Sequence, residues 1–383
     1  MHIAVIGAGM IGAAAARHLA TMGHQVTLVG PAEPADAATW QGPFGSHFDE
    51  GRITRQLDPW PFWSQASRAS IARYRDLEAA SGMRFFSEVG SLMAGPAGSA
   101  AMNRLEATRD RDQVPCETLR GDTLAARFPW FDFGPDMLGL YEATLAGVVN
   151  PRAMVRAQIA LARAGGAQLL RRSVSGLDES AAGIRLRLDS GEDLLADRAL
   201  LATGGFTRSL LGEALPFQVN ARTVVFFEVS EAEAQRLAGM PTLIALLPNG
   251  EDPYMLPPIR YPDGRLYLKM GGDRVDAPLT TEEDLTAWFR SSGNPEVAAY
   301  VESLMRARMP TLDILSTSSA ACVTTYAPKK IPHFEALSDR VFTAFAGSGR
   351  AAKNSDELGR LGALLASGQA LPNWATQAAV AAT

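Results

Sequence analysis

A glycine-rich hexapeptide near the start of the chain is the first pattern that could do chemistry. Residues 7 to 12 read Gly-Ala-Gly-Met-Ile-Gly and directly follow the apolar run Ile3–Ile6. In a strand–turn–helix setting, three glycines at this spacing allow a tight turn, close approach of a diphosphate to the backbone, and close packing of helix on strand. The helix N-terminus then offers free N–H groups and the positive end of the helix dipole to the phosphates. We therefore predict a dinucleotide site formed by Gly7, Gly9, Met10, Ile11 and Gly12.

An acidic residue that usually accompanies this motif is missing. The second strand of such a unit ordinarily ends in Asp or Glu, which binds the adenosine ribose. Here the strand Gln25–Val29 runs into Gly30 and Pro31, and the next carboxylate along the chain is Glu33, either a ribose ligand or a solvated loop residue. The motif by itself therefore fits NAD as well as FAD.

Strands and helices alternate in the segments that must position this site. The pattern predicts a strand at Ile3–Ile6, a helix at Ile11–Met22 and a strand at Gln25–Val29. Similar α/β segments follow, with helices at Ala153–Ala164 and Asp356–Ala366 and strands at Gln168–Leu170, Arg198–Ala202 and Val341–Ala344. Between residues 218 and 270 the pattern is β-rich, and helical periodicity covers residues 62–81 and 281–309. An α/β fold of two interleaved domains follows from this alternation.

Composition limits the classes of partner. The chain has 383 residues, 47% of them hydrophobic and 20% charged, which is ordinary for a globular protein. Because 36 Lys and Arg face 41 Asp and Glu, the net charge is −5, and we expect no nucleic-acid partner. The longest uncharged apolar stretch, Ile3–Ala16, is shorter than the roughly 18 residues of a membrane span. We expect a cytoplasmic protein without a membrane partner.

Cysteine and histidine are sparse. Cys116 and Cys322 are the two cysteines, so no disulfide framework is indicated. The five histidines are scattered without the spacing of metal ligands, and we predict no metal site.

Several further segments, taken in order, resemble one family of flavoenzymes. They are residues 45–55 (Gly-Ser-His-Phe-Asp-Glu-Gly-Arg-Ile-Thr-Arg), 88–92, 201–204, 266–271, 321–325 and 347–353. Together they resemble the monomeric sarcosine oxidase and N-methyl amino acid oxidase family of D-amino acid oxidase-like FAD-dependent oxidoreductases. The resemblance implies an α/β fold with an α+β insert, in which a Rossmann-type FAD-binding domain is interleaved with a β-sheet substrate (cap) domain. We predict residues 1–61, 150–217 and 321–383 for the FAD-binding domain and residues 62–149 and 218–320 for the cap domain.

The resemblance also implies how FAD is held. Cys322 matches the cysteine that the family joins by a thioether to the 8α methyl of the flavin, which implies covalent FAD. Taken by itself, a lone cysteine in an apolar stretch is an inert buried residue. Arg55 is expected near the flavin. The other predicted cofactor-binding residues outside the hexapeptide are Ser46, Arg52, Val174, Gly204, Gly349 and Lys353.

Four residues are predicted to act on the substrate or on oxygen. Arg52 and Lys353 match the pair that holds the substrate carboxylate in the family, a role that suits a guanidinium fork and an ammonium. Lys269 matches a lysine beside the flavin, where a fixed cation helps oxygen to accept electrons. Without the resemblance, Lys269 would be a solvent-facing residue on a half-buried strand. Tyr254 matches a substrate-pocket position or is a core aromatic.

The chain departs from the family at several pocket positions. Phe48, Asp273 and Arg350 stand where the family has histidines, and Thr324 stands where it has a tyrosine. These departures make sarcosine itself a doubtful substrate. Asp273 could pair with a cationic group of the substrate, or with Arg274 or Lys269.

The predicted function is FAD-dependent oxidation of a carboxylate-bearing amine or amino acid, secondary or N-methylated. The resemblance implies hydride transfer to flavin N5, hydrolysis of the imine, and reduction of oxygen to hydrogen peroxide. The expected partners are a small amine with a carboxylate and oxygen, and the expected assembly is a monomer or small homo-oligomer. The alternatives are a flavin dehydrogenase with another electron acceptor, an NAD-dependent dehydrogenase, and a nucleotide-binding regulator that turns over no amine.

Overall fold

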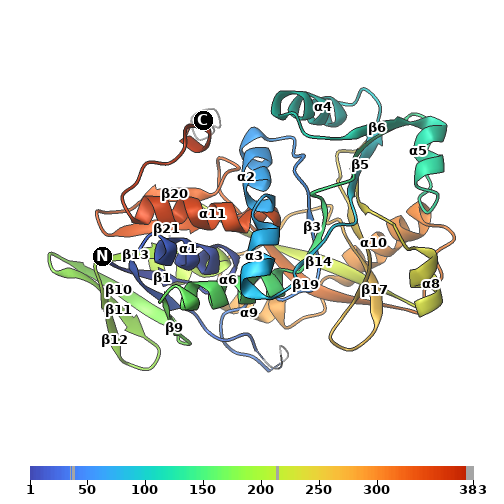
Figure 1. Ribbon diagram of the computed structural model, residues 1–383. Helices are drawn as coiled ribbons and strands as arrows, with labels where there is room; N and C mark the ends of the chain where they lie inside the picture. The colour runs from blue at the N-terminus through green and yellow to red at the C-terminus, as the bar shows by residue number, and fades with distance from the viewer. Residues whose placement is uncertain (35, 37–38, 213–214, 377–383) are drawn as a thin grey trace.

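The computed structural model describes residues 1–34, 36, 39–212 and 215–376. They fold around two large β-sheets, a six-stranded sheet at one end of the molecule and a nine-stranded sheet at the other (Figure 1). Each sheet collects strands from distant parts of the chain, so the path crosses between them several times.

The six-stranded sheet is mainly parallel and centres on β1. In spatial order its strands are β20 (His333–Ala336), β21 (Val341–Phe345), β13 (Arg198–Leu201), β1 (His2–Ile6), β2 (Gln25–Val29) and β9 (Gln168–Leu170). β1 pairs in parallel with β13 and β2, whereas β20 pairs antiparallel with β21. Ile3, Ala4 and Val5 are fully buried, as expected of a parallel strand that is covered on both faces.

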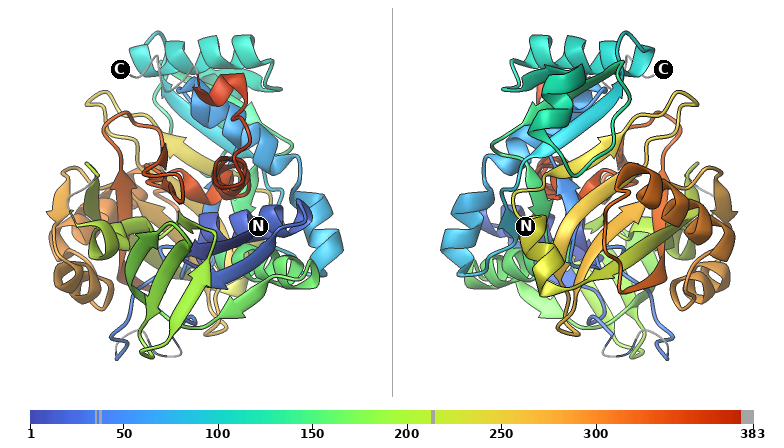
Figure 2. Two further views of the ribbon diagram at one scale, coloured as in Figure 1. Left: turned by 90° about the vertical axis from the view of Figure 1, so that its left-hand side faces the viewer. Right: turned by 90° about the vertical axis from the view of Figure 1, so that its right-hand side faces the viewer.

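Helices cover one face of this sheet and a small sheet covers the other. α1 (Met10–Thr21) packs between α11 (Ala351–Ala366) and α6 (Pro151–Ala164), in one apolar cluster with Ile3 and Val5. On the opposite face, Ala4 and Ile6 pack against a sheet of three strands, drawn in green in Figure 2. Its strands are β10 (Val174–Ser180), β11 (Gly183–Leu188) and β12 (Asp193–Ala196).

The predicted strand–helix–strand unit at the N-terminus is confirmed, and the helix lies one residue earlier at each end than expected. α6 begins two residues before the predicted start at Ala153. α11 begins five residues before the predicted Asp356, because a turn with positive φ at Ala346, Ser348 and Gly349 ends directly before Ala351.

The nine-stranded sheet is mostly antiparallel. Its order is β18 (Ala277–Leu279), β14 (Gln218–Val229), β17 (Leu266–Gly271), β16 (Tyr254–Arg260), β15 (Thr242–Ala245), β5 (Ser91–Pro96), β7 (Met137–Glu142) and β6 (Glu117–Arg120), and β19 (Ser316–Tyr326) pairs with β14. Alternate residues of its strands, such as Val225, Phe227 and Leu268, pack in one cluster with residues of α10 (Pro295–Arg308). The residues between them in sequence are left for the opposite face of the sheet.

Both long helical predictions are split in two. Residues 62–81 form α2 (Pro61–Ile71) and α3 (Tyr74–Ser81), and residues 281–309 form α9 (Glu282–Phe289) and α10. α10 starts anew because the Asn294 side chain caps its first turn and Pro295 occupies its first position. The remaining elements are β3 (Arg52–Thr54), β4 (Phe86–Ser87), α4 (Ala100–Asp112), α5 (Gly121–Arg127), β8 (Gly147–Val149), a 3₁₀ turn (Gly204–Thr207), α7 (Arg208–Leu211) and α8 (Glu231–Arg236).

The two sheets divide the chain much as the predicted domains do. The six-stranded sheet draws on residues 2–29, 168–201 and 333–345, and the nine-stranded sheet on residues 91–142 and 218–326. β19 crosses the predicted boundary at residue 320, and the domain division stays a prediction. Residues 35, 37–38, 213–214 and 377–383 of the predicted ranges lie outside the described residues. Among the described helices, none combines the length and the apolar character needed to cross a bilayer.

Candidate functional site

A cavity of about 1040 Å³ is lined by residues from both large sheets. This exceeds the ~300–1,000 Å³ of most small-ligand sites. Its walls include the following predicted site residues: Gly7, Gly9, Met10, Ile11, Ser46, Arg52, Arg55, Val174, Gly204, Tyr254, Cys322, Gly349 and Lys353. Two predicted residues lie behind the wall instead, namely Gly12, which packs on Gly7, and Lys269, which is fully buried.

The N-terminus of α1 forms a cradle of backbone at one end of the cavity. A side-chain Cβ at Gly12 would overlap the carbonyl oxygen of Gly7, so α1 lies directly on the turn after β1. At Gly9 the nearest atom to an added Cβ would be Nδ1 of His47 at 3.8 Å, which leaves open space beside the helix. Because Gly9 is the N-cap and has no capping side chain, the first N–H groups of α1 are left for an anionic ligand.

Glu33 lies on the cavity wall beyond the end of β2, where the acidic residue of the motif is missing. Its carboxylate contacts the guanidinium of Arg152. A side chain at Gly30 would collide with Ala8, because β2 ends against the glycine turn. Glu33 is thus a carboxylate near the expected place of the ribose, and its contact with a ribose stays a prediction.

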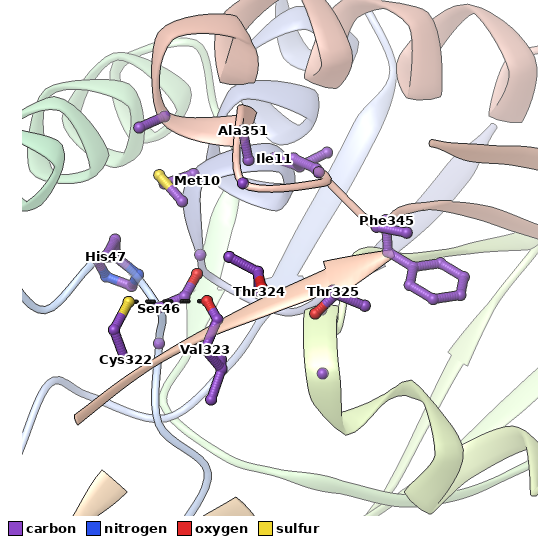
Figure 3. Close-up of a pocket in the computed structure, with 18 of the residues that line it drawn as sticks. Met10, Ile11, Ser46, His47, Cys322, Val323, Thr324, Thr325, Phe345 and Ala351 are labelled. Carbon is purple, nitrogen blue, oxygen red and sulfur yellow. Dashed lines mark hydrogen bonds between the residues drawn. The ribbon is translucent and has the colours of Figure 1, made fainter. Parts of the chain in front are cut away.

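Cys322 faces the cavity from β19, on a stretch of strand opposite the start of α1 (Figure 3). Arg52 donates hydrogen bonds to the Cys322 Sγ at 3.5 Å and to the Ser46 carbonyl at 3.2 Å. Burial lowers the pKa of nearby His47 to about 3, so its imidazole is neutral at pH 7.

Two hydroxyl groups on the cavity wall lack protein partners. Within the described part of the chain, the buried Oγ1 of Thr324 and Oγ of Ser348 accept or donate no hydrogen bond. Buried polar atoms are nearly always paired, so a polar ligand is the expected partner. The open cradle, these hydroxyls and a cysteine beside a guanidinium suit FAD.

A cluster of three cations on the cavity wall surrounds one buried carboxylate. The Oδ2 of Asp58, which is 0% exposed, accepts hydrogen bonds from Lys353 Nζ at 3.0 Å and from Arg350 Nε at 3.1 Å. Arg55 Nη2 lies 3.6 Å from the same oxygen. The structure thus brings Lys353 together with Arg55 and Arg350, and not with Arg52 as predicted.

The charged groups in this cluster shift one another's pKa values. Burial opposes the ionised form of Asp58, but Lys353, Arg350 and Arg55 hold the pKa of its carboxyl well below the usual range. Burial, together with Arg55, lowers the pKa of the Lys353 ammonium to about 7, against the opposing effect of Asp58. Lys353 is therefore only partly charged at neutral pH.

Lys269 is paired with a carboxylate of its own. Its ammonium contacts the Asp49 carboxylate and donates to the Gly51 carbonyl at 2.7 Å. Asp49 also contacts the Arg52 guanidinium and accepts a hydrogen bond from the Tyr261 hydroxyl at 2.8 Å. Because Lys269 is fully buried, the alternative prediction of a solvent-facing lysine is wrong.

Two carboxylates face the cavity beside Tyr254. Burial raises the pKa of Asp273 to about 6, although Thr223 N–H donates to its oxygens at 3.2 Å, and burial also raises the pKa of Asp252. Of the predicted partners of Asp273, Arg274 pairs with Glu251 and Lys269 with Asp49. The Arg222 guanidinium on the cavity wall acts on Asp273, and pairing of Asp273 with a cationic group of the substrate stays a prediction.

Sequence reasoning missed Asp49, Asp58 and Asp252. Asp49 and Asp58 lie three residues from Arg52 and Arg55, respectively, a spacing that hints at ion pairs. Nothing in the local pattern indicates that the partners from β17 and α11 converge on the same carboxylates. Among the described residues, no group of three or more His, Cys, Asp or Glu is placed to hold a metal ion.

Comparison with known proteins agrees with this geometry. The sequence model of one family, described as FAD dependent oxidoreductase, matches residues 2–365. Monomeric sarcosine oxidase of Bacillus sp. (strain B-0618) is 26% identical over 315 residues, which cover 79% of this chain and 76% of the relative. N-methyl-L-tryptophan oxidase of Salmonella typhi is 25% identical over 277 residues, which cover 72% of this chain and 71% of the relative.

Solved structures resemble the whole chain. NikD, an amino acid oxidase essential for nikkomycin biosynthesis, superposes in its open form with a TM-score of 0.74 at 21% identity and covers 95% of this chain and 93% of its own. Amadoriase I, a fructosyl amine oxidoreductase of Aspergillus fumigatus, superposes with a TM-score of 0.74 at 18% identity and covers 100% and 91%. These likenesses confirm the predicted fold class.

Proposed function

The chain belongs to the family of FAD-dependent oxidoreductases, and from this premise we propose that it oxidises a carboxylate-bearing secondary or N-methylated amine, with oxygen as the electron acceptor. The carrying observation is a single cavity that joins a dinucleotide cradle to a cluster of cations on Asp58. The relatives named as oxidases of sarcosine and N-methyl-L-tryptophan support the substrate class.

The residues that would hold FAD lie along the first half of the cavity. The N–H groups at the start of α1 would bind the diphosphate, and Glu33 would bind the ribose. Ser46, Thr324 and Ser348 would offer polar groups to the ring system, and Cys322 would be the point of covalent attachment. When bound, FAD supplies the two-electron acceptor that takes the hydride of the amine and returns the electrons to oxygen.

The second half of the cavity would orient the amine. Arg55, Arg350 and Lys353 provide positive charge for a carboxylate, while Ile53, Met93, Ile244, Leu246 and Tyr254 provide an apolar wall. A carboxylate fixed at the cations places the carbon next to nitrogen at a constant distance from them, which is the contribution of orientation to the rate. The apolar wall excludes water from the reacting carbon.

Asp273 would meet the amine end of the substrate. Above pH 6 its carboxylate is ionised and attracts an ammonium. Its hydrogen bonds from Thr223 N–H fix the carboxylate on the wall. Asp252 also lines the cavity, but the charged groups that act on it are Arg350, Arg55 and Asp58 of the cation cluster.

The proposal that oxygen is the electron acceptor rests on the two cations near Cys322, Arg52 and Lys269. Arg52 and Lys269 both contact Asp49, and burial lowers the pKa of the Lys269 ammonium well below its usual range. Positive charge on this pair would stabilise the charge that develops on oxygen. The same contact favours the second candidate, a flavin dehydrogenase with a quinone or carrier-protein acceptor, because Asp49 weakens the field of Lys269.

The test begins with the visible spectrum of the purified protein and with acid precipitation. We expect a flavin spectrum, with the colour retained in the pellet, and release of the colour by Cys322→Ser. Sarcosine, N-methyl-L-alanine, L-proline and pyrrolidine are then compared as substrates, with peroxide as the readout. Rapid anaerobic bleaching followed by slow recolouring in oxygen would favour the dehydrogenase. Oxidation of pyrrolidine in preference to all three acids would contradict the proposed carboxylate.

A further inference from the structure

Arg350 and Lys353 differ in how they face the cavity. Both donate to the Oδ2 of Asp58, at 3.1 Å and 3.0 Å. Yet 25% of the Arg350 side chain is exposed, against 2% of the Lys353 side chain. A ligand in the cavity can therefore reach the guanidinium of Arg350 more readily than the ammonium of Lys353.

The donors of Arg350 are incompletely used. Its Nε donates to Asp58 and its Nη1 donates to the Ser348 carbonyl at 3.0 Å. Nη2 has no hydrogen-bond partner among the described residues. A guanidinium carries five N–H donors in one plane, so the free edge of Arg350 can bind a carboxylate with two hydrogen bonds.

Both the backbone and the side chain of Arg350 are held firmly. It is the N-cap residue of α11, its N–H donates to the Gly347 carbonyl at 2.7 Å, and its carbonyl accepts from Asn354 Nδ2 at 2.8 Å. Asp58 fixes the Nε edge, and both Asp58 oxygens are occupied because Oδ1 accepts from Trp60 N–H at 3.2 Å. The guanidinium is thus oriented before a ligand arrives.

The two cations also differ in the permanence of their charge. The pKa of Lys353 is lowered to about 7 by burial and by Arg55, so it loses its charge within the neutral range. A guanidinium stays protonated at any pH that proteins tolerate. The charged groups that face this cluster are Arg55, Asp58, Glu142, Asp252, Arg350 and Lys353.

We propose that Arg350 is the residue that binds the substrate's carboxylate, that Asp58 positions its guanidinium, and that Lys353 does not touch the substrate. The inference rests on the proposed function, since it requires a carboxylate on the substrate. It assigns to Arg350 the carboxylate contact that the sequence led us to expect of Lys353. The ammonium of Lys353 instead donates a hydrogen bond to the carboxylate of Asp58.

The test measures the dissociation constant of propionate for the FAD-loaded enzyme, through the change that it causes in the visible flavin spectrum. We expect Arg350→Gln to raise the constant about 30-fold, as for the loss of hydrogen bonds to a charged group. Lys353→Gln is expected to change it less than about 5-fold, since a nearby charge without contact contributes little. Arg104→Gln, which removes an exposed cation from the same cavity wall, serves as the control.

A second measurement needs no variant. Between pH 7 and 9 propionate stays ionised and Lys353 loses its proton. If Arg350 binds propionate, the constant for the wild type changes less than about 5-fold over this range. If Lys353 binds it, the constant rises about 50-fold, because the bound anion requires the charged amine.

The positioning role of Asp58 is tested by the pH dependence of propionate binding in a variant. In Asp58→Asn the binding of propionate weakens, and the remaining pH dependence moves below pH 7 because Lys353 loses its anionic partner. Mere loss of structure would lower the melting temperature without moving this midpoint.

Two results would overturn the inference. One is a larger effect of Lys353→Gln than of Arg350→Gln, and the other is a 50-fold pH effect in the wild type. If instead the wild type binds no propionate and still oxidises pyrrolidine, the proposed carboxylate substrate fails, and the inference fails with it for that separate reason.

Discussion

The walls at the two ends of the cavity are made of different parts of the chain. At the nucleotide end they are backbone, where Gly7 and Gly12 let a turn and a helix pack closely and Gly9 leaves open space beside the helix. At the substrate end they are charged side chains, where Asp58 meets Arg55, which directly follows β3, and Lys353 of α11, which lies 295 residues away in sequence. A side chain at Gly7 or Gly12 would collide with backbone atoms, whereas the cluster depends on the balance of its charges.

The largest effect on stability and FAD binding is expected at Gly12, where α1 packs on the turn after β1. Gly12→Val places atoms on the Gly7 carbonyl and forces α1 away from β1, at a cost of about 3 kcal/mol in the free energy of unfolding. We expect loss of bound FAD, measured by absorbance at 450 nm, and a lower melting temperature. Gly134→Ala is the control, because a Cβ there meets open space. A variant that keeps both its FAD and its melting temperature would mean that the backbone of the cradle is free to move.

The next largest effect is expected at the charge cluster. Asp58→Ala leaves Lys353, Arg350 and Arg55 without their shared carboxylate, which destabilises the protein by about 3 kcal/mol. Urea unfolding measures the change. The control is Asp178→Ala, which breaks an exposed pair with Arg187 at 3.1 Å and is expected to change the free energy of unfolding by less than about 0.5 kcal/mol. Equal effects of the two variants would show that the cluster does not stabilise the fold.

The same contrast explains what could be predicted from the sequence. The cradle is local, because a strand, three glycines and a helix lie within residues 2–21, and their roles follow from steric rules alone. The alternation of strands and helices, and the place of Cys322 on the cavity wall, were predictable for the same reason or from resemblance.

The charge clusters could not be predicted in this way. Asp49 meets Lys269 across 220 residues and Asp58 meets Lys353 across 295, and no periodicity links such positions. The sequence predicted Arg52 together with Lys353 and Arg55 near the flavin, whereas the structure places Arg55 beside the Asp58 carboxylate that Lys353 contacts and Arg52 beside Cys322. The two arginines lie only three residues apart, Arg52 in β3 and Arg55 directly after it. Their side chains reach different groups because they leave the backbone in different directions.

A third charged group, Lys269 with Asp49, offers a comparison within the catalytic cycle. Lys269→Met is expected to slow re-oxidation by oxygen about 10-fold, less than the ~100-fold of removing an uncompensated donor, and to leave reduction by the amine nearly unchanged. Asp49→Asn, which frees the ammonium, is expected to speed re-oxidation. Stopped-flow absorbance separates the two half-reactions, with Lys329→Met as an exposed control. Unchanged re-oxidation in both variants would exclude the pair from the oxygen reaction.

The smallest effect is expected at Asp273, where one carboxylate acts through a single charge. Burial raises its pKa to about 6, so the ionised form that attracts an ammonium exists mainly above pH 6 and is lost as the pH falls. We expect kcat/KM for the amine to fall up to about 10-fold per pH unit below pH 6, since binding then requires a group that is mostly protonated. Asp273→Asn should lower kcat/KM several-fold at pH 8 and remove this acidic limb. Because Asp273 sits on the substrate wall and not in the cradle, FAD content should stay at the wild-type level. A limb that persists in Asp273→Asn would assign it to another group, with Asp252 on the same wall as the next residue to replace.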